Sequence, residues 1–207
     1  MTKADLVRYR IDGLDLAVKD YRPRPFFVRN LLGRLALRRE AAAYRAAAGI
    51  PGLAEFHGRP DPFSIVLCWI SGTPLSEMPA APAVLGDVFD RLDEIVARLH
   101  ERGIAIGDLH HRDVLVSDDG AVHVVDLATS VVLGDSPGIL RRALFERLRD
   151  QDRIALARMR ARRTGGDEDA AIAAAGPRAA ARYSRWRRLR RIWDAVRGRR
   201  RERGSRP

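Results

Sequence analysis

The most informative segment of this 207-residue chain reads Leu99-His100-Glu101-Arg102-Gly103-Ile104-Ala105-Ile106-Gly107-Asp108-Leu109-His110-His111-Arg112-Asp113-Val114-Leu115-Val116, and Val124-Val125-Asp126-Leu127-Ala128 follows a few residues later. The first residues of this segment are the end of a predicted helix. A loop with two aspartates follows, and a β-branched run begins at Val114. The Asp119-Gly120 pair before the second β-branched run is typical of a tight hairpin turn. We therefore expect Asp108, Asp113 and Asp126 to converge at one edge of a hairpin.

Three carboxylates placed this close together repel one another unless a cation neutralises them. Mg²⁺ is a suitable cation, because it takes one or two carboxylates and completes its coordination with phosphate oxygens and water. In the competing interpretation, each aspartate separately forms a turn next to a strand, as aspartates often do. The joint spacing favours a shared site.

This spacing resembles that of the protein-kinase-like superfamily. The kinase catalytic loop, H-R-D-x-x-x-x-N, places the base and a metal ligand five residues apart, and a second metal ligand, in D-F-G, follows a hairpin. The resemblance implies that Asp108 is the catalytic base and that Asp113 and Asp126 coordinate Mg²⁺. It runs from about Leu6 to Ala128 and implies ATP and Mg²⁺ as cofactors.

Lysine is rare in this chain: only Lys3 and Lys19 are lysines among 38 basic residues. The run Leu16-Ala17-Val18-Lys19 resembles V-A-I-K, so the resemblance implies that Lys19 holds the α- and β-phosphates. Glu40, on a predicted helix, would be its partner. The alternatives are a surface lysine on an edge strand and a solvated helix charge.

A short apolar strand, Ser64–Ile70, and the Ser71-Gly72-Thr73-Pro74 linker after it resemble the kinase hinge. In that place Cys68 and Ile70 would line an adenine pocket. Cys68 has a second interpretation as a small buried hydrophobic residue. Because it is the single cysteine, an internal disulfide and a cysteine-built zinc site are excluded.

The order of predicted elements indicates the fold class. The elements are a hairpin (Leu6–Ile11 and Leu14–Lys19), a helix (Phe27–Ala48), a strand (Ser64–Ile70), a helix (Val84–Arg102), a hairpin (Val114–Val116 and Val122–Val125) and helices after Gly138. This order predicts an α+β fold with two small sheets rather than repeated βαβ units. The resemblance implies a minimal two-lobed kinase-like domain over residues 1–177. Its small N-terminal lobe (about 1–70) holds a sheet and one helix, and its C-terminal lobe (about 75–177) is mainly helical.

Within the superfamily, Gly107-Asp108-Leu109-His110 and the lack of an A-P-E motif make the chain similar to bacterial RIO-like and lipopolysaccharide-core kinases. This similarity implies phosphorylation of a protein Ser/Thr or of a Kdo or heptose sugar in the lipopolysaccharide inner core. His110 and His111 also suggest a metal-ligand pair. Because neighbours in sequence point in different directions, we expect His110 to pack within the loop instead.

Several positions depart from the kinase pattern. No G-x-G-x-x-G precedes Lys19, and we expect no room for a full first strand and glycine loop. Either the hairpin around Gly13 cradles the phosphates, or the chain binds them poorly. Asp113 replaces the usual asparagine, Ala128 replaces the glycine of D-F-G, and Ile106 replaces a histidine. These departures leave open an alternative function, a pseudokinase scaffold that recruits a partner or a membrane through its basic C-terminal segment.

That basic segment, residues 178–207, holds thirteen arginines and two acids and therefore carries all of the net charge of +11. The rest of the chain is neutral, so the net charge is no evidence for a nucleic-acid-binding domain. One helical stripe of the segment is apolar: Trp186, Leu189, Ile192, Trp193 and Val196. The stripe either docks on the C-terminal lobe or lies on an anionic membrane as an amphipathic helix. RNA is the least favoured partner.

Two further features concern the compartment. No apolar run reaches the roughly 18 residues that a membrane-spanning helix needs, and Met1-Thr2-Lys3-Ala4-Asp5 lacks the apolar core of a signal peptide. We expect a cytoplasmic protein, with the inner leaflet of the inner membrane as its peripheral location if the basic segment binds lipid.

Overall fold

The computed structural model describes residues 3–79, 81–177, 180–181 and 183–184. Its strands are β1 (Asp5–Ile11), β2 (Leu14–Asp20), β3 (Phe56–Asp61), β4 (Ser64–Cys68), β5 (Thr73–Pro74), β6 (Ile104–Ala105), β7 (Val114–Val116), β8 (Val122–Val124) and β9 (Val131–Val132). Its helices are the π-helical η1 (Val28–Gly33) and the α-helices α1 (Arg34–Ala46), α2 (Pro82–Glu101), α3 (Ile139–Thr164) and α4 (Glu168–Ala174). The predicted α+β class, with small antiparallel sheets, is confirmed.

The N-terminal part of the molecule is a four-stranded antiparallel sheet in the order β1-β2-β4-β3. β1 and β2 form the predicted hairpin, and both residues of its turn, Asp12 and Gly13, have positive φ (51° and 81°), as a tight two-residue turn requires. The register of the hairpin places Leu6 opposite Lys19. The first residues of β1 therefore lie beside the end of β2 that carries Lys19.

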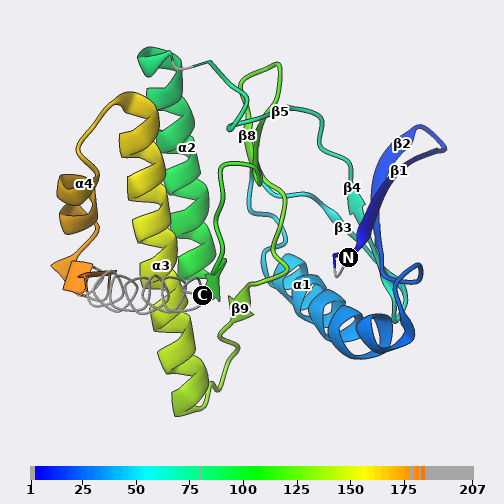
Figure 1. Ribbon diagram of the computed structural model, residues 1–207. Coiled ribbons are helices and arrows are strands. Elements are labelled where there is room, and N and C mark those ends of the chain that lie inside the picture. Colours follow the sequence, from blue (N-terminus) through cyan, green and yellow to red (C-terminus); the bar gives the residue numbers. More distant parts are fainter. Residues whose placement is uncertain (1–2, 80, 178–179, 182, 185–207) are drawn as a thin grey trace, which may run out of the picture.

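A helix packs against β3 and β4 of this sheet (Figure 1). The helix predicted over residues 27–48 is two elements, the wider η1 followed by α1. α1 buries an apolar face that includes Leu37, Ala41 and Tyr44. Gly33 lies at the junction, where an added Cβ would come within 2.6 Å of the Tyr21 ring. A larger residue there would push the helix away from the sheet.

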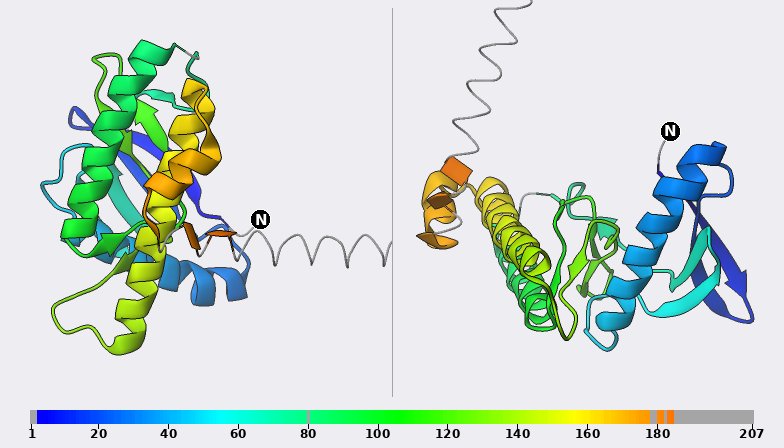
Figure 2. Two further views of the ribbon diagram at one scale, coloured as in Figure 1. Left: turned by 90° about the vertical axis from the view of Figure 1, so that its left-hand side faces the viewer. Right: turned by 90° about the horizontal axis from the view of Figure 1, so that it is seen from below.

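The C-terminal part is dominated by α2 and α3, which run side by side (Figures 1 and 2). The three-to-four-residue apolar period predicted a helix over Val84–Arg102, and α2 confirms it. Its buried side chains are Leu85, Val88, Phe89, Leu92, Ile95, Val96 and Leu99. Gly103 follows the end of α2, and its positive φ (70°) and close approach to Leu133 both favour glycine.

The β7–β8 hairpin, extended by β5, joins the two parts of the molecule. Leu53, between α1 and β3, forms a parallel bridge with Val124 of β8. A single hydrophobic core continues through both parts and includes Leu37, Ile65 and Phe89 as well as Val124. The loop between β6 and β7, which carries the acidic motif, is therefore held where the two parts meet.

Four short strands were not predicted from the sequence: β3, β5, β6 and β9. β3 lies at the sheet edge, contains Gly58 and Pro60, and pairs with β4 through register shifts. Glycine and proline weaken the sequence signal of a strand but are tolerated at an edge. The other three strands have two residues each, too few for a pattern.

The start of the basic segment packs against the C-terminal helices. Ile154 of α3 and Ile172 of α4 form a small cluster, and Ala180 and Tyr183 cover it. The Arg158 guanidinium lies 5.1 Å from the centre of the Tyr183 ring. The predicted apolar stripe at residues 186–196 lies outside the described residues. In the described part of the chain, no helix combines the length and apolar character that crossing a membrane requires.

Candidate active site

Lys19 joins three segments that are far apart in the sequence. Its side chain is 14% exposed, and its ammonium group pairs with Glu40 of α1, whose side chain is only 2% exposed. The same nitrogen donates to Asp126 Oδ1 at 3.2 Å, on the segment that follows β8. The structure thus brings the predicted partners Lys19 and Glu40 together and links them to one of the three predicted acids.

Burial acts on the two partners of this pair in opposite ways. It disfavours the Lys19 ammonium, but the carboxylates of Glu40 and Asp126 outweigh burial and raise the pKa of Lys19. Burial is also the largest influence on Glu40 and raises the pKa of its carboxyl, against the attraction of Lys19. Lys19 is therefore a fixed positive charge beside Asp126 at neutral pH.

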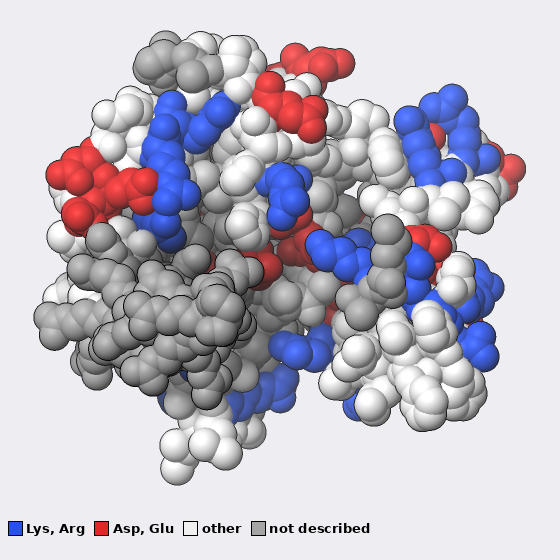
Figure 3. All heavy atoms as spheres, in the orientation of Figure 1, with Lys and Arg blue, Asp and Glu red and all other residues white. Residues whose placement is uncertain are grey.

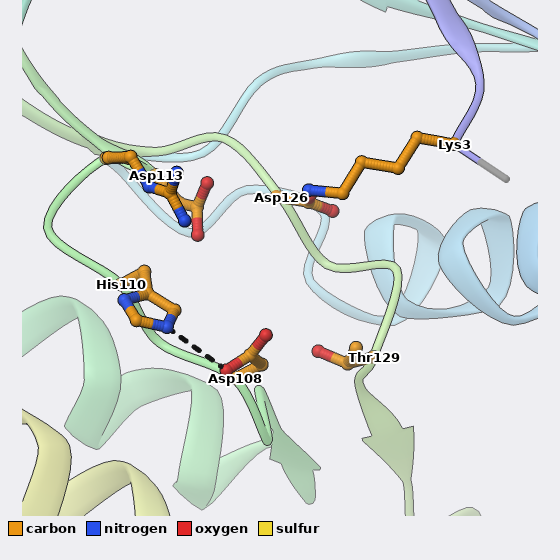
Figure 4. Close-up of a pocket in the computed structure, with 7 residues that line it drawn as sticks. Lys3, Asp108, His110, Asp113, Asp126 and Thr129 are labelled. Carbon is orange, nitrogen blue, oxygen red and sulfur yellow. Dashed lines mark ion pairs between the residues drawn. The ribbon is translucent and has the colours of Figure 1, made fainter. Parts of the chain in front are cut away.

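A cavity of about 260 Å³ opens beside Asp126. The residues that line it are all polar or charged: Lys3, Asp108, His110, Arg112, Asp113, Asp126 and Thr129. Figure 4 shows Asp108, Asp113 and Asp126 arranged around one space, and Figure 3 shows acidic and basic side chains together where the two parts of the molecule meet. The predicted convergence of the three aspartates is confirmed. Such a lining suits phosphate groups and a cation rather than an apolar ligand.

Asp108 is the most accessible of the three acids, with its side chain 62% exposed. His110 Nε2 lies 3.6 Å from Asp108 Oδ1. His110 is 48% exposed and contacts two residues of its own loop, Asp108 and His111, whose ring centre lies 6.0 Å away. The His110 ring faces Asp108 at the cavity edge (Figure 4). A hydroxyl group entering from solvent can reach Asp108.

A buried carboxylate on α3 anchors the loop that presents Asp108. Asp152 is completely buried and accepts hydrogen bonds from the backbone N–H groups of Ile106 (2.8 Å) and Gly107 (2.7 Å). Its Oδ2 also lies 3.0 Å from Nε2 of His100, at the end of α2. Sequence reasoning missed Asp152. The available signal was its place on the apolar face of α3, between the buried Phe145 and Leu156.

Gly107 makes the sharp turn immediately before Asp108. Its φ is +85°, and an added Cβ would lie 3.2 Å from the Thr129 carbonyl oxygen and 3.3 Å from a Leu148 methyl group. Gln151 Nε2 donates to the Gly107 carbonyl at 2.7 Å, and Thr129 Oγ1 donates to the Ile106 carbonyl at 2.9 Å. The backbone N–H and carbonyl groups of Ile106 and Gly107 are therefore held by α3 or by the segment after Asp126.

The segment after β8 fixes Asp126 in the same manner. The Tyr44 hydroxyl of α1 donates to the Val125 carbonyl at 2.9 Å, and the Ala128 N–H donates to Asp126 Oδ1 at 3.0 Å. Asp126 Oδ1 thus accepts from both Ala128 and Lys19. Neither of these two groups donates to Oδ2, and the Asp126 side chain lines the cavity.

Asp113 is half-buried at the start of β7, opposite Asp126 in the cavity (Figure 4). Burial, followed by the negative charge of Asp126, raises the pKa of Asp113. Within the described part of the chain, no group of three or more His, Cys, Asp or Glu side chains lies close enough to hold a metal ion. Two carboxylates are nevertheless a sufficient protein donor set for Mg²⁺ when phosphate oxygens and water supply the rest. Asp113 and Asp126 fit that chemistry.

The two residues predicted to contact adenine, Cys68 and Ile70, do not line this cavity. Cys68 is half-buried in β4, with its N–H bonded to the Glu55 carbonyl at 2.8 Å. Ile70 packs against the hydrophobic core. Neither is among the residues that line the cavity. The structure brings together Lys19, Glu40, Asp108, Asp113 and Asp126 but not Cys68 and Ile70.

The glycine turn of the first hairpin is also far from the cavity, so the expectation that it cradles phosphates is wrong. Gly13 lies between Ile11 and Leu14, which pair next to the turn. Lys19 pairs with Leu6, five residues further along each strand, which is roughly 17 Å at the usual rise of a strand. The antiparallel register itself separates Gly13 from Lys19.

No protein-family model matches this chain, and a search of curated proteins finds no similar one.

Proposed function

We propose that the protein is an ATP- and Mg²⁺-dependent phosphotransferase with a two-lobed, kinase-like arrangement. The observation that carries the proposal is the Lys19–Glu40 ion pair, joined through Lys19 to Asp126 at a cavity that also holds Asp108 and Asp113. A buried lysine paired in this way supplies a fixed charge, and the polar cavity beside it suits phosphate groups.

In this proposal Lys19, oriented by Glu40, binds the α- and β-phosphates of the nucleotide. Asp108 orients the acceptor hydroxyl and takes its proton while the hydroxyl oxygen bonds to the terminal phosphorus. The bond from that phosphorus to the bridging oxygen breaks, and ADP leaves. Positioning and charge neutralisation supply most of the catalysis in reactions of this kind.

Asp113 and Asp126 would hold Mg²⁺, which supplies neutralisation of phosphate charge when it is bound. Both are carboxylates that face the cavity, and the raised pKa of Asp113 reflects a site where negative charges are crowded. Lys19 already offsets part of the charge of Asp126 through the 3.2 Å contact. The two acids would hold the metal ion, and Lys19 would bind the phosphates beside it.

The acceptor we propose is a hydroxyl group of a protein Ser/Thr or of a lipopolysaccharide inner-core sugar. The 62% exposure of Asp108 supports an acceptor that approaches from solvent. ATP places the activity in the cytoplasm, and the basic segment 178–207 would allow contact with the anionic inner leaflet. Nucleic acid is not a proposed substrate.

A second candidate function is a pseudokinase scaffold without turnover. The observation in its favour is that Gly13, the one glycine before Lys19 in the sequence, lies far from the cavity. A scaffold would bind nucleotide weakly or not at all and act through its basic segment. The two candidates therefore differ in what the cavity binds.

Thermal unfolding with and without nucleotide tests the proposal. A ligand that binds only the folded state stabilises it by about 2.7 kcal/mol at 100 times its dissociation constant. We expect millimolar Mg-ATP to raise the melting temperature, and ATP with excess EDTA to raise it much less. The matched control is the Asp126→Asn variant, in which the Mg²⁺-dependent part of the shift should disappear. An unchanged melting curve with Mg-ATP would contradict the proposal and would favour the pseudokinase scaffold instead.

A further inference from the structure

The cavity contains a lysine that the kinase-like set does not use. Lys3 lines it together with Asp108 and Asp126, and Figure 4 shows its side chain extended across the space toward Asp126. The chain has only two lysines among 38 basic residues, and both lie at this site. Lys3 is exposed, so its ammonium group is accessible to a ligand from solvent.

The fold places Lys3 here through the register of the first hairpin. Asp5 pairs with Asp20 and Leu6 pairs with Lys19, so the residues before β1 lie beside the Lys19 end of β2. Arg24, which is only 15% exposed, holds this segment in two ways. Its Nε donates to the Lys3 carbonyl at 2.6 Å, and its guanidinium forms an ion pair with Asp5. The backbone of Lys3 is thus anchored while its side chain remains free to adjust.

The negative charge of the cavity lining indicates what Lys3 can bind there. Three carboxylates line the cavity, and a triphosphate would bring further negative charge into the same space. Lys19 is occupied by Glu40 and Asp126, and the Gly13 turn is far away, so neither covers the outer end of the nucleotide. A lysine ammonium is a compact charge with three donors, which makes it a common phosphate ligand.

We infer that Lys3 binds the terminal phosphate of the nucleotide and takes the place of a glycine-rich loop at this site. The inference rests on the proposed function, because it assigns a ligand group within the same cavity. Lys3 lines the same cavity as Asp108, which would present the acceptor, whereas Lys19 is only 14% exposed and is not among the lining residues. Lys3 therefore contacts the phosphate that is transferred, whereas Lys19 contacts the phosphates that leave.

Isothermal titration calorimetry of the full chain with Mg-ATP and Mg-ADP tests this assignment. Since hydrogen bonds to charged groups are strong, we expect Lys3→Ala to weaken Mg-ATP binding about tenfold and Mg-ADP binding by about twofold at most. Lys3→Arg, which keeps the charge, should restore most of the Mg-ATP affinity. The matched control is Arg10→Ala, which removes one positive charge from the same hairpin at a side chain that is 70% exposed and far from the cavity. It should leave both affinities unchanged.

The outcomes distinguish a failure of the Lys3 assignment from a failure of the proposed phosphotransferase function. Equal affinities in Lys3→Ala, Arg10→Ala and the unsubstituted protein would overturn the role of Lys3 while leaving the proposed function standing. An equal loss for Mg-ATP and Mg-ADP would overturn the assignment to the terminal phosphate. If the unsubstituted protein binds no Mg-ATP, the proposed function and the inference are both wrong. The melting temperatures of the ligand-free variants should agree, because Lys3 is an exposed residue.

Discussion

Lys19 has two tasks that can be separated by substitution: it neutralises the buried Glu40, and it holds Asp126 beside the cavity. Removing one partner of a buried ion pair leaves an uncompensated charge, which typically destabilises a protein by about 3–5 kcal/mol. We expect Lys19→Met to lower the free energy of unfolding by about 3 kcal/mol in urea titrations. The same variant should show no calorimetric binding of Mg-ATP.

The double variant Lys19→Met with Glu40→Leu is the control for this prediction. Replacing a buried ion pair by apolar side chains is often neutral or stabilising. The double variant should therefore regain most of the lost stability while Mg-ATP binding stays absent. Binding that returns together with stability would mean that Lys19 has only a structural role.

Single residues were predictable where their spacing along the chain carried the signal. Lys19 followed from its place at the end of an apolar run in an arginine-rich sequence, and the three aspartates followed from their positions around a hairpin. Lys3 and Asp152 were not predicted as site residues. The place of Lys3 depends on the register of the first hairpin, and that of Asp152 depends on the packing of α3 against the loop that carries Asp108. Neither can be predicted from the neighbouring residues in the sequence.

Among the elements, α3 controls the acidic loop through Asp152. Hydrogen bonds to a charged group contribute about 1.5–3 kcal/mol each, and Asp152 accepts two from the loop backbone. We expect Asp152→Asn to destabilise the protein by at least about 2 kcal/mol, because the new amide N–H₂ faces backbone donors. Hydrogen exchange followed by NMR should show faster exchange at the Ile106 and Gly107 amides. Asp118→Asn, an exposed aspartate between β7 and β8, is the matched control and should change neither quantity.

The turn at Gly107 allows the cost of backbone strain to be separated from the cost of a steric clash. Gly107 and Gly120 have similar positive φ values, 85° and 79°, but an added Cβ meets atoms at 3.2 Å only at Gly107. A non-glycine residue in this region of φ costs about 1–2 kcal/mol. We expect Gly120→Ala to show that cost alone in urea unfolding, and Gly107→Ala to show a larger one. Equal losses would mean that the loop can shift away from Thr129 freely.

The elements themselves were predictable in proportion to their length. α2 carries a repeated apolar pattern and the two hairpins carry Asp-Gly turns, and each was predicted close to its observed bounds. The π-helical η1 was merged with α1, because a wider helical turn has no sequence pattern of its own. The two-residue strands β5, β6 and β9 are defined by pairing with strands distant in the sequence, so their own residues carry no pattern.

At the scale of the whole molecule, the basic segment makes contact with the folded body at its beginning. Tyr183 packs on the cluster of Ile154 and Ile172, and the Arg158 guanidinium lies against its ring. Deleting residues 178–207 removes this cover as well as all of the net positive charge. We therefore expect the deletion to lower the melting temperature by several degrees, at about 2–4 °C per kcal/mol for a chain of this size.

A sedimentation assay with anionic vesicles distinguishes the other interpretation of this segment. If it lies on the membrane instead, the deleted protein should keep its melting temperature and lose vesicle binding. Binding by the full chain should then fall steeply with added salt, because the attraction is screened over about 8 Å at physiological ionic strength. An unchanged melting temperature would contradict the docked arrangement.

The most direct test of phosphoryl transfer is the rate of ADP formation from Mg-ATP. It should be measured with a lipopolysaccharide inner-core acceptor, with a Ser/Thr-rich protein acceptor and with water alone. We predict ADP formation by the unsubstituted protein and a loss of at least about a hundredfold in Asp108→Asn, since a positioned base contributes that much. Mg-ATP affinity should remain within about twofold, because Asp108 acts on the acceptor. Asp118→Asn should match the unsubstituted protein. Mg-ATP binding without ADP formation under any of these conditions, or equal rates in Asp108→Asn and the unsubstituted protein, would contradict the proposed activity.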